Sequence, residues 1–472
     1  MSEVISIHIG NTGIQTGLKM WELYWKTYEQ SNLKEESKLG RLKLFRGIET
    51  KHRGLNSDMI IYSDPTSLKA RALLVDVEAD PINQLYKSTY SDLFDAENII
   101  TSGECTGSVY ARVYRSLAPD LSDKIAESIR KEVERTSLVE GFNLTHSVSG
   151  GTGAGLWTSI SEHLEEEYPK KERLSFDILS SDKLASTAVE PLNQALGMAK
   201  LVEVSRSSCF FEMTQISKII KKALKDSPGA RSRKDQFQNI NDAVAYHSYK
   251  IMSGIALNNQ HVISNLTYIA RSVAMYPGLH FSSSSLSLEK IPLNNLASEW
   301  EGIKIQQTSL KTLNKHLNST SVNPLYGLDS SSKHFNISAL CQGEALTSKV
   351  LGQGMIMDLR TMRKLVDWAP CGFKYGLDCS LPPCLDQSRL RIPRQNVMIL
   401  HTLTNFFYLI DKVLQRFERI YRKKLYLHHY DAEGMDFDEF ELAVEKLKQC
   451  SEDYKEISQD LEDEDDEDDE DF

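Results

Sequence analysis

The sequence predicts an α/β fold whose core is a doubly wound, mostly parallel sheet, and three observations support this prediction. Apolar runs of strand length alternate with helix-patterned segments through the first half of the chain. Two of these runs, ending near residues 9 and 148, are followed directly by glycine-rich turns. In such a sheet these turns lie at the carboxyl ends of the strands, where ligands bind.

The composition is that of a globular protein with a large buried core. The chain has 472 residues, of which 40% are hydrophobic and 26% are charged, and this length predicts two or three sub-domains. No apolar run is long enough to span a bilayer, and Met1-Ser2-Glu3 lacks the basic flank of a signal peptide. Seven scattered cysteines favour free thiols. We therefore expect a cytoplasmic protein with no membrane or nucleic-acid partner.

The net charge of −11 is concentrated at the carboxyl terminus, where Glu462 to Asp471 are ten consecutive carboxylates. Self-repulsion keeps such a block extended, so residues 460–472 are expected to form a disordered acidic tail. The tail is suited to attract basic partners, and a role in solubility alone fits the composition equally well.

The first elements are a strand, a helix and a long loop. Residues 4–9 read as a buried strand, and Gly10 opens a turn and early helix that form a candidate phosphate loop. Residues 31–70 are polar and basic, which predicts a long surface loop. The next strand ends in Asp76 and Glu78, which point to the same face if both lie on the strand.

The later elements continue the alternation and then become helical. A long, rather apolar helix precedes a second α/β region, and two amphipathic helices form a hairpin before the tail. The predicted strands are 72–78, 142–148 and 174–179, and the predicted helices are 121–138, 157–168, 237–257, 405–421 and 436–457.

The most informative segment is Ser-Gly-Gly-Thr-Gly-Ala-Gly at 149–155, which lies between a strand and a helix. Glycines permit positive-φ conformations in which successive N–H groups converge on an anion, and the following helix adds its positive end. The segment lacks the Gly-Lys-Ser/Thr of a Walker A loop, and its glycine spacing differs from a dinucleotide fingerprint. The alternative is a flexible glycine linker.

Together these motifs resemble tubulin over essentially the whole chain. The start MSEVISIHIGNTGIQTGLKMWELYW looks like an α-tubulin start, and SGGTGAG is similar to the tubulin signature GGGTGSG. LVDWAPCGFKYG matches a late family segment, and DAEGMDFDEF resembles the turn of its C-terminal hairpin. The length after Pro382-Pro383 and the aromatic end of the tail are α-like. The resemblance implies a divergent α-tubulin-like chain with the tubulin fold.

The resemblance also implies a bound GTP with Mg²⁺, and each expected contact can be located on this chain. Asp76 and Glu78 match the magnesium-side carboxylates, for which surface acids are the alternative. Phe237 and Asn241, four residues apart, match the positions that stack on and hydrogen-bond the base. The implied nucleotide-binding residues are Gly10, Asn11, Ser108, Ser149, Gly150, Gly151, Thr152, Gly153, Ala154, Glu190, Asn193, Phe237 and Asn241.

Three of these residues depart from the family pattern. Asn11 replaces a glutamine, Ser108 an asparagine and Ser149 the first signature glycine. The backbone donors of the turns are unchanged by these substitutions, so GTP binding is still expected.

A fourth departure concerns hydrolysis. In α-tubulins an acid in a helix before a Tyr-Pro pair promotes hydrolysis of nucleotide held by the neighbouring β subunit; here Tyr268 and Asn265 take the acidic positions. Tyrosine, with a pKa of about 10, is a poor general base at neutral pH. No Asp or Glu occurs from Ala243 through Leu288, and His261 is the nearest titratable alternative. The chain is therefore not expected to supply the hydrolytic acid.

The favoured function is a structural one: a GTP-binding, α-tubulin-like constituent of the microtubule cytoskeleton that pairs with a β-type tubulin. The alternatives are a regulatory protein that caps or sequesters tubulin, and an independent Rossmann-type nucleotide enzyme. Basic microtubule-associated proteins or motors are expected at the hairpin and tail. The predicted parts are a GTP-binding domain at 1–214, a core helix and intermediate domain at 215–394, the hairpin at 395–459 and the tail at 460–472.

Overall fold

The computed structural model describes most of the chain, with several intervals left out. The described residues are 3–31, 45–47, 68–180, 183–223, 233–257, 265–274, 276, 278–287, 321–322, 333–342, 365–366, 372–378 and 396–459. The predicted acidic tail and His261 lie outside them. None of the described helices is both long and apolar enough to cross a membrane.

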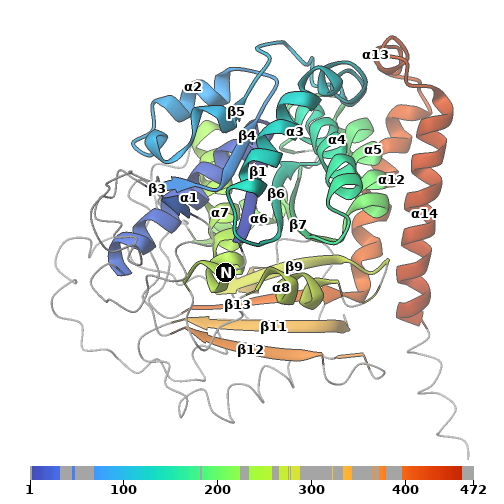
Figure 1. Cartoon of the computed structure of the whole chain (residues 1–472). Helices are drawn as coiled ribbons and strands as arrows, with labels where there is room; N and C mark the ends of the chain where they lie inside the picture. The colour runs from blue at the N-terminus through green and yellow to red at the C-terminus, as the bar shows by residue number, and fades with distance from the viewer. Residues whose placement is uncertain are drawn as a thin grey trace, which may run out of the picture.

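Six parallel strands form the amino-terminal half of the main sheet (Figure 1). In spatial order they are β5 (Ile99–Ile100), β4 (Ala72–Val75), β1 (Glu3–Ile9), β6 (Val139–Ser147), β7 (Glu172–Leu179) and β8 (Ser207–Glu212). Strand β1 pairs in parallel with β4 on one side and β6 on the other. The chain therefore builds outward from β1 in both directions, which places a topological switch point at its carboxyl end.

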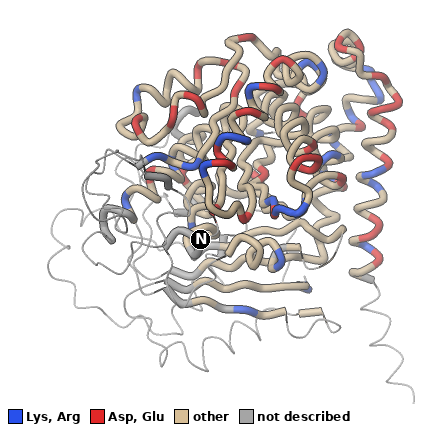
Figure 2. Tube along the Cα trace, viewed as in Figure 1, with Lys and Arg blue, Asp and Glu red and all other residues tan. Residues whose placement is uncertain are grey.

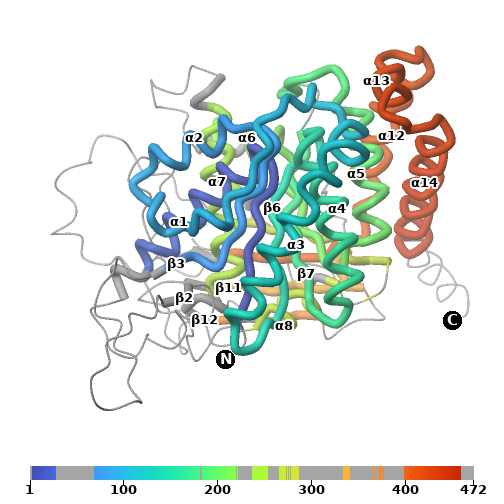
Figure 3. The backbone as a smooth tube through the Cα atoms, turned by 45° about the horizontal axis from the view of Figure 1, so that its top comes forward, coloured from blue at the N-terminus to red at the C-terminus, as the bar shows by residue number. Residues whose placement is uncertain are grey.

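Helices cover both faces of this half of the sheet, as a doubly wound fold requires. One face buries residues of α1 (Gly10–Ser31), α2 (Asp80–Tyr86), α6 (Met213–Ala223) and α7 (Arg233–Leu257). The other face buries residues of α3 (Ala118–Glu134), α4 (Gly151–Glu167) and α5 (Glu190–Val204), with the π-helical turn η6 (Arg112–Leu117) leading into α3. Figure 3 shows the second group of helices on the near side of the strands. The predicted α/β architecture is confirmed.

The second α/β region continues the same sheet. Strand β9 (Phe281–Ser287) pairs in parallel with β8, and β13 (Asn396–Leu403), β11 (His334–Gln342) and β12 (Phe373–Asp378) follow it. Because β13 runs antiparallel to β9 and β11, this part is mixed. The short β10 (Ser321–Val322) pairs with β9, and α8 (Leu266–Val273) lies beside this part of the sheet. The domain boundaries near residues 214 and 394 stay predictions.

The predicted C-terminal hairpin is confirmed and packs on α5. It consists of η8 (Thr404–Phe406), α12 (Phe407–Tyr421), α13 (His428–Asp431) and α14 (Phe437–Gln459). Leu409, Val413 and Phe417 of α12 are buried in the same core cluster as Leu447 and Tyr454 of α14. Figure 2 shows acidic and basic residues interspersed along the outer helix α14. The apolar stripes of both helices thus fix the hairpin to the body.

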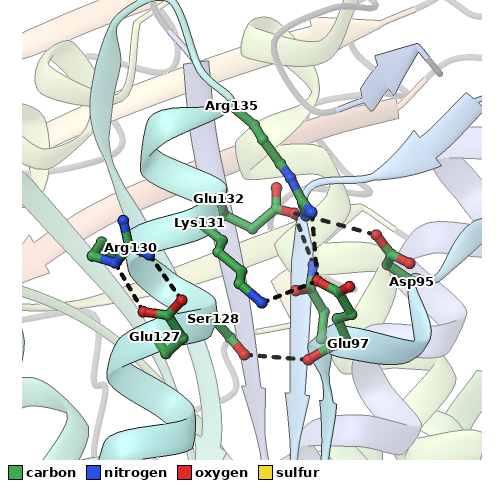
Figure 4. A network of polar contacts seen from close by, with 9 residues as sticks. Asp95, Glu97, Glu127, Ser128, Arg130, Lys131, Glu132 and Arg135 are labelled. Atoms are coloured by element: carbon green, nitrogen blue, oxygen red, sulfur yellow. Dashed lines mark hydrogen bonds and ion pairs between the residues drawn. The ribbon is translucent and has the colours of Figure 1, made fainter. Parts of the chain in front are cut away.

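A polar network secures the short edge strand β5 (Figure 4). Arg135, which follows α3, contacts Glu97 and Asp95, while Lys131 also reaches Glu97. Glu132 is fully buried and accepts hydrogen bonds from Asn98 at 2.9 Å and Arg135 at 3.1 Å. These contacts tie α3 to η5 (Ala96–Asn98), which lies directly before β5. The short helix η4 (Ser91–Leu93) precedes η5 in the chain. The network therefore fixes the segment that leads into the edge strand.

Several element boundaries differ from the prediction. Helix α4 begins at Gly151, six residues before the predicted start at Trp157, because glycines form its first turns. Strand β4 ends at Val75, so Asp76 and Glu78 lie in the turn that follows and not on the strand. The predicted loop 31–70 contains β2 (Phe45–Gly47), which pairs with β3 (Leu68–Ala70); the rest of it lies outside the described residues.

Candidate functional site

The two glycine turns meet at the switch point. Gly10 follows β1 with φ of +71°, a conformation that favours glycine. A Cβ added to Gly10 would lie 3.1 Å from the backbone nitrogen of Gly153, at the start of α4. The amino-terminal turns of α1 and α4 are therefore side by side, and both present N–H groups that lack partners within their helices. This arrangement suits a phosphate chain.

The glycine run acts through close packing. The prediction of positive φ angles within 149–155 is wrong, since none of its glycines has one and Gly150 lies at φ −83°. A Cβ at Gly151 would lie 2.5 Å from the carbonyl carbon of Ser108, and one at Gly153 would lie 2.5 Å from the carbonyl oxygen of Ser147. Because Gly151 and Gly153 have no side chains, the neighbouring loops can approach the start of α4 closely. Ala154 faces inward and is fully buried.

The loop 101–109 supplies the third side of the site. Ser108 has φ of +59°, a left-handed conformation that is uncommon for a residue other than glycine and that asparagine tolerates better than serine. The Thr106 hydroxyl accepts from the Ser108 N–H at 3.2 Å and from the Thr152 hydroxyl at 3.5 Å. It donates to Glu78 Oε1 at 3.1 Å. One hydroxyl thus links the glycine run with a predicted magnesium-side carboxylate.

Asp76 has the properties of a metal-binding carboxylate. It is buried; its Oδ1 accepts from the Glu78 N–H at 3.1 Å, while Oδ2 has no hydrogen-bond partner among the described residues. Burial raises the pKa of Asp76 to about 7. A divalent cation would satisfy the free oxygen and stabilise the charged form, and the nearby Glu78 and Thr106 offer further hard oxygen ligands. The donor set fits Mg²⁺.

Glu190 closes the turn before α5. Its Oε1 accepts from the Ser186 N–H at 2.7 Å, the Ser186 hydroxyl at 2.8 Å and the Thr187 N–H at 3.2 Å. The carboxylate also contacts the hydroxyl of Ser180. This acid at the helix amino terminus orders the loop predicted to lie on the ribose side.

Asn193 is buried at the centre of the site and makes four hydrogen bonds within the protein. Its Nδ2 donates to the carbonyl oxygens of Ser108 at 2.8 Å and Ser149 at 3.2 Å. Its Oδ1 accepts from the Tyr110 N–H at 3.0 Å and the Tyr430 hydroxyl at 2.6 Å. These bonds use both donors and both lone pairs of the amide. In this structure Asn193 joins the two loops that surround the glycine run.

Ser149, which replaces a signature glycine, turns its hydroxyl toward α5. Its Oγ accepts from the Ser180 N–H at 2.8 Å and from Gln194 Nε2 at 2.6 Å. The substitution therefore adds contacts within the protein next to the phosphate turn. Gln194 was missed by the sequence analysis, where only its adjacency to Asn193 could have suggested it.

The base side of the site is reached through a chain of amides. Asn241 on α7 donates to Gln15 Oε1 at 2.8 Å, and Gln15 Nε2 donates to Asn11 Oδ1 at 2.7 Å. Phe237 lies one turn before Asn241 and is partly buried. Gln15 was also missed, although its four-residue spacing from Asn11 places both on one face of α1. Gln15 thus connects Asn11 of the phosphate loop with Asn241 on the predicted base side.

The predicted hydrolysis position lies at the opposite end of the sheet. The N–H of Thr267 in α8 donates to Glu140 at 3.1 Å, in the first residues of β6, whereas the glycine run follows the last residue of this nine-residue strand. The strand separates the two ends by roughly 30 Å. Figures 1 and 3 show α8 beside the amino terminus of β1. The protein therefore has a nucleotide end and an α8 end.

Carboxylates at the α8 end come from the first residues of three strands, with Glu3 on β1, Glu140 on β6 and Glu172 on β7. Strands β9, β11 and β13 contain no charged residues, as Figure 2 shows for their described parts. Tyr268 is 41% exposed, and Lys374 Nζ lies 4.7 Å from its ring centroid while donating to Ser272 at 3.3 Å. Asn265 precedes α8 and is exposed. Glu140, which sequence reasoning did not consider, is the acid that contacts the first turn of α8, and its Oε2 is buried.

A switch point flanked by two glycine turns and a carboxylate-bearing strand end defines a nucleotide-binding α/β domain. Residues 3–221 match the GTPase domain of the Tubulin/FtsZ family. The α-6 tubulin chain of Naegleria pringsheimi is 26% identical over 462 residues, which cover 97% of this chain and 96% of that relative. The α-tubulin chain of Pneumocystis carinii is 27% identical over 466 residues, or 98% of each chain. These matches confirm the predicted resemblance: the chain is a divergent, α-tubulin-like protein with the tubulin fold.

Proposed function

We propose that this chain binds GTP with Mg²⁺ where the two glycine turns meet. The observation that carries the proposal is the contact between Gly10 and Gly153, which joins two helix amino termini into one anion-binding surface. Asp76 and Glu78 would hold the magnesium ion, which would supply positive charge beside the phosphates. Asn241 and Phe237 would hold the base. The phosphates of GTP would supply the negative charge that the backbone N–H groups and the metal ion stabilise.

The chain acts as an α-like structural subunit that pairs with a β-type tubulin in cytoplasmic microtubules. Two relatives that match it over nearly their full length are α-tubulin chains. The nucleotide end and the α8 end lie at opposite poles, which suits head-to-tail assembly because each pole can meet a neighbour. Motors or basic microtubule-associated proteins would bind the hairpin and the acidic residues 462–471.

Helix α8 contains no acid that could promote hydrolysis of the neighbour's GTP. Tyr268 occupies the acidic position and lies under Lys374, so this exposed position carries a tyrosine and a cation. A β-type subunit in contact with this end would therefore hydrolyse its bound GTP more slowly.

Co-sedimentation with polymerised α/β-tubulin tests the structural role. We expect the chain to pellet with microtubules and, when fluorescently labelled, to lie along their whole length. Labelling confined to the ends would favour the capping alternative, and depletion of polymer with the chain left in the supernatant would favour sequestration.

Asp76 should make the effect of magnesium on stability depend on pH. Without the metal its pKa is raised, so its contribution to folding is greatest at low pH and is lost as the pH rises through about 7. Mg²⁺ binds the charged form, so with saturating GTP we expect it to raise the melting temperature more at pH 8 than at pH 6. Asp76→Asn should abolish this difference, and the exposed Asp80→Asn should preserve it. Equal responses in both variants would exclude Asp76 as a ligand.

A further inference from the structure

The C-terminal hairpin contributes two buried side chains to the loops of the nucleotide site. Tyr430 on α13 and Arg416 on α12 both reach inward to α5 and the loops beside it. They are separated from these partners by more than 200 residues in sequence. The hairpin surface predicted to bind motors and associated proteins is therefore joined directly to the proposed GTP site.

The first connection runs through Asn193. The Tyr430 hydroxyl donates to Asn193 Oδ1 at 2.6 Å, and both side chains are fully buried. Asn193 also donates to the carbonyl oxygens of Ser108, which packs against Gly151, and of Ser149. Because the amide has no spare donor or acceptor, loss of the tyrosine hydroxyl leaves one of its lone pairs unsatisfied in the interior. Tyr430 thus helps to fix the side-chain amide that spaces the two loops.

The second connection runs through Gln194. Arg416 donates from Nη1 to Gln194 Oε1 at 2.9 Å and to the Ser180 carbonyl at 3.0 Å. Gln194 Nε2 in turn donates to Ser149 Oγ at 2.6 Å. The guanidinium orients the glutamine amide so that its donor points to the residue before the glycine run. Arg416 and Tyr430 therefore converge on the same segment from different helices of the hairpin.

We propose that Tyr430 and Arg416 are positioning residues for the nucleotide site, so that nucleotide binding and the packing of the hairpin are thermodynamically coupled. The proposal rests on the GTP site described above. Neither side chain needs to touch the nucleotide, because each acts through Asn193 or Gln194 on the loops beside Gly151. Coupling is reciprocal: if the hairpin contacts strengthen nucleotide binding, bound nucleotide must strengthen the hairpin contacts by the same factor.

The test compares Tyr430→Phe with Tyr454→Phe in the full-length chain. Tyr454 is a buried tyrosine of α14 whose ring stacks with Phe281, so its substitution removes a hydroxyl from the same hairpin away from Asn193. The dissociation rate of a fluorescent GTP analogue should rise about three- to tenfold in Tyr430→Phe, the effect of one buried hydrogen bond. It should stay unchanged in Tyr454→Phe.

Hydrogen exchange measures the reciprocal effect. In the wild-type chain GTP should slow amide exchange in residues 428–431, and in Tyr430→Phe this protection should be lost while protection in β6 remains. If Tyr430→Phe binds the GTP analogue as the wild type does, and GTP protects residues 428–431 in it equally well, the proposed coupling is wrong. If the wild-type chain itself binds no GTP analogue, the proposed function fails first, and the two failures are thereby distinguished.

Discussion

Gly151→Ala and Gly153→Ala are expected to weaken GTP binding about 10- to 100-fold, whereas Gly150→Ala should leave the packing at the start of α4 unchanged and weaken binding less. An added methyl at Gly151 or Gly153 would lie 2.5 Å from backbone atoms of Ser108 or Ser147, which cannot rotate away. The start of α4 must then shift relative to its neighbours, at a cost of about 1–3 kcal/mol. The displaced N–H groups no longer converge on the phosphates. Titration with a fluorescent GTP analogue measures the change.

Gly150 is the matched control for packing within the protein, because it lies in the same run but is not crowded by other protein atoms. Its added Cβ would come no closer than 4.0 Å, to the Ser147 hydroxyl, and its φ of −83° suits any residue. Circular dichroism would establish that all three variants are folded. Equal affinities for the three variants would mean that close packing at the start of α4 does not shape the site.

Copolymers of this chain with a β-type tubulin should release phosphate slowly, and Tyr268→Glu should accelerate the release by up to about 10²–10⁴, the usual range for a positioned general base. The tyrosine is exposed on α8 and can meet a neighbour. Lys374, now 4.7 Å from the ring centroid, would hold the introduced carboxylate ionised. The measurement is phosphate release per incorporated chain in a polymerisation assay.

Two further variants separate the possible acids. Tyr268→Gln introduces a similar polar side chain without a proton acceptor of suitable basicity, so its release should stay slow. Glu140→Gln tests the carboxylate that contacts Thr267 at the start of α8. Rapid release by the wild-type chain, reduced in Glu140→Gln, would show that Glu140 replaces the missing acid and that the α8 end does supply a group for hydrolysis.

The sequence predicted the parts of the protein that depend on local pattern. β1, β6 and β7 are apolar runs that end in turns, and the hairpin helices keep a clear apolar stripe, so periodicity located them. The sequence located the glycine run correctly, but it did not predict that these glycines serve close packing and not positive φ angles. Whether a glycine serves positive φ or close approach depends on what packs against it, and Ser108 and Ser147 are brought there by the fold.

The contacts within the site could not be predicted because they join distant segments. Asn193 was singled out for the nucleotide, yet its bonds to Tyr110 and Tyr430 depend on how η6 and α13 pack around α5. The Gln15 link depends on the packing of α1 against α7. Local spacing can place two residues on one helix face, but it does not indicate which other helix that face meets.

Direct identification of the bound nucleotide tests the central claim, that the two glycine turns form a guanine nucleotide site. Purified, folded chain is denatured with acid, and the supernatant is resolved by anion-exchange chromatography against guanine and adenine nucleotide standards. We predict close to one guanine nucleotide per chain, and much less after purification of Gly153→Ala. A folded chain that carries no guanine nucleotide, and takes none up from excess GTP with Mg²⁺, would contradict the account.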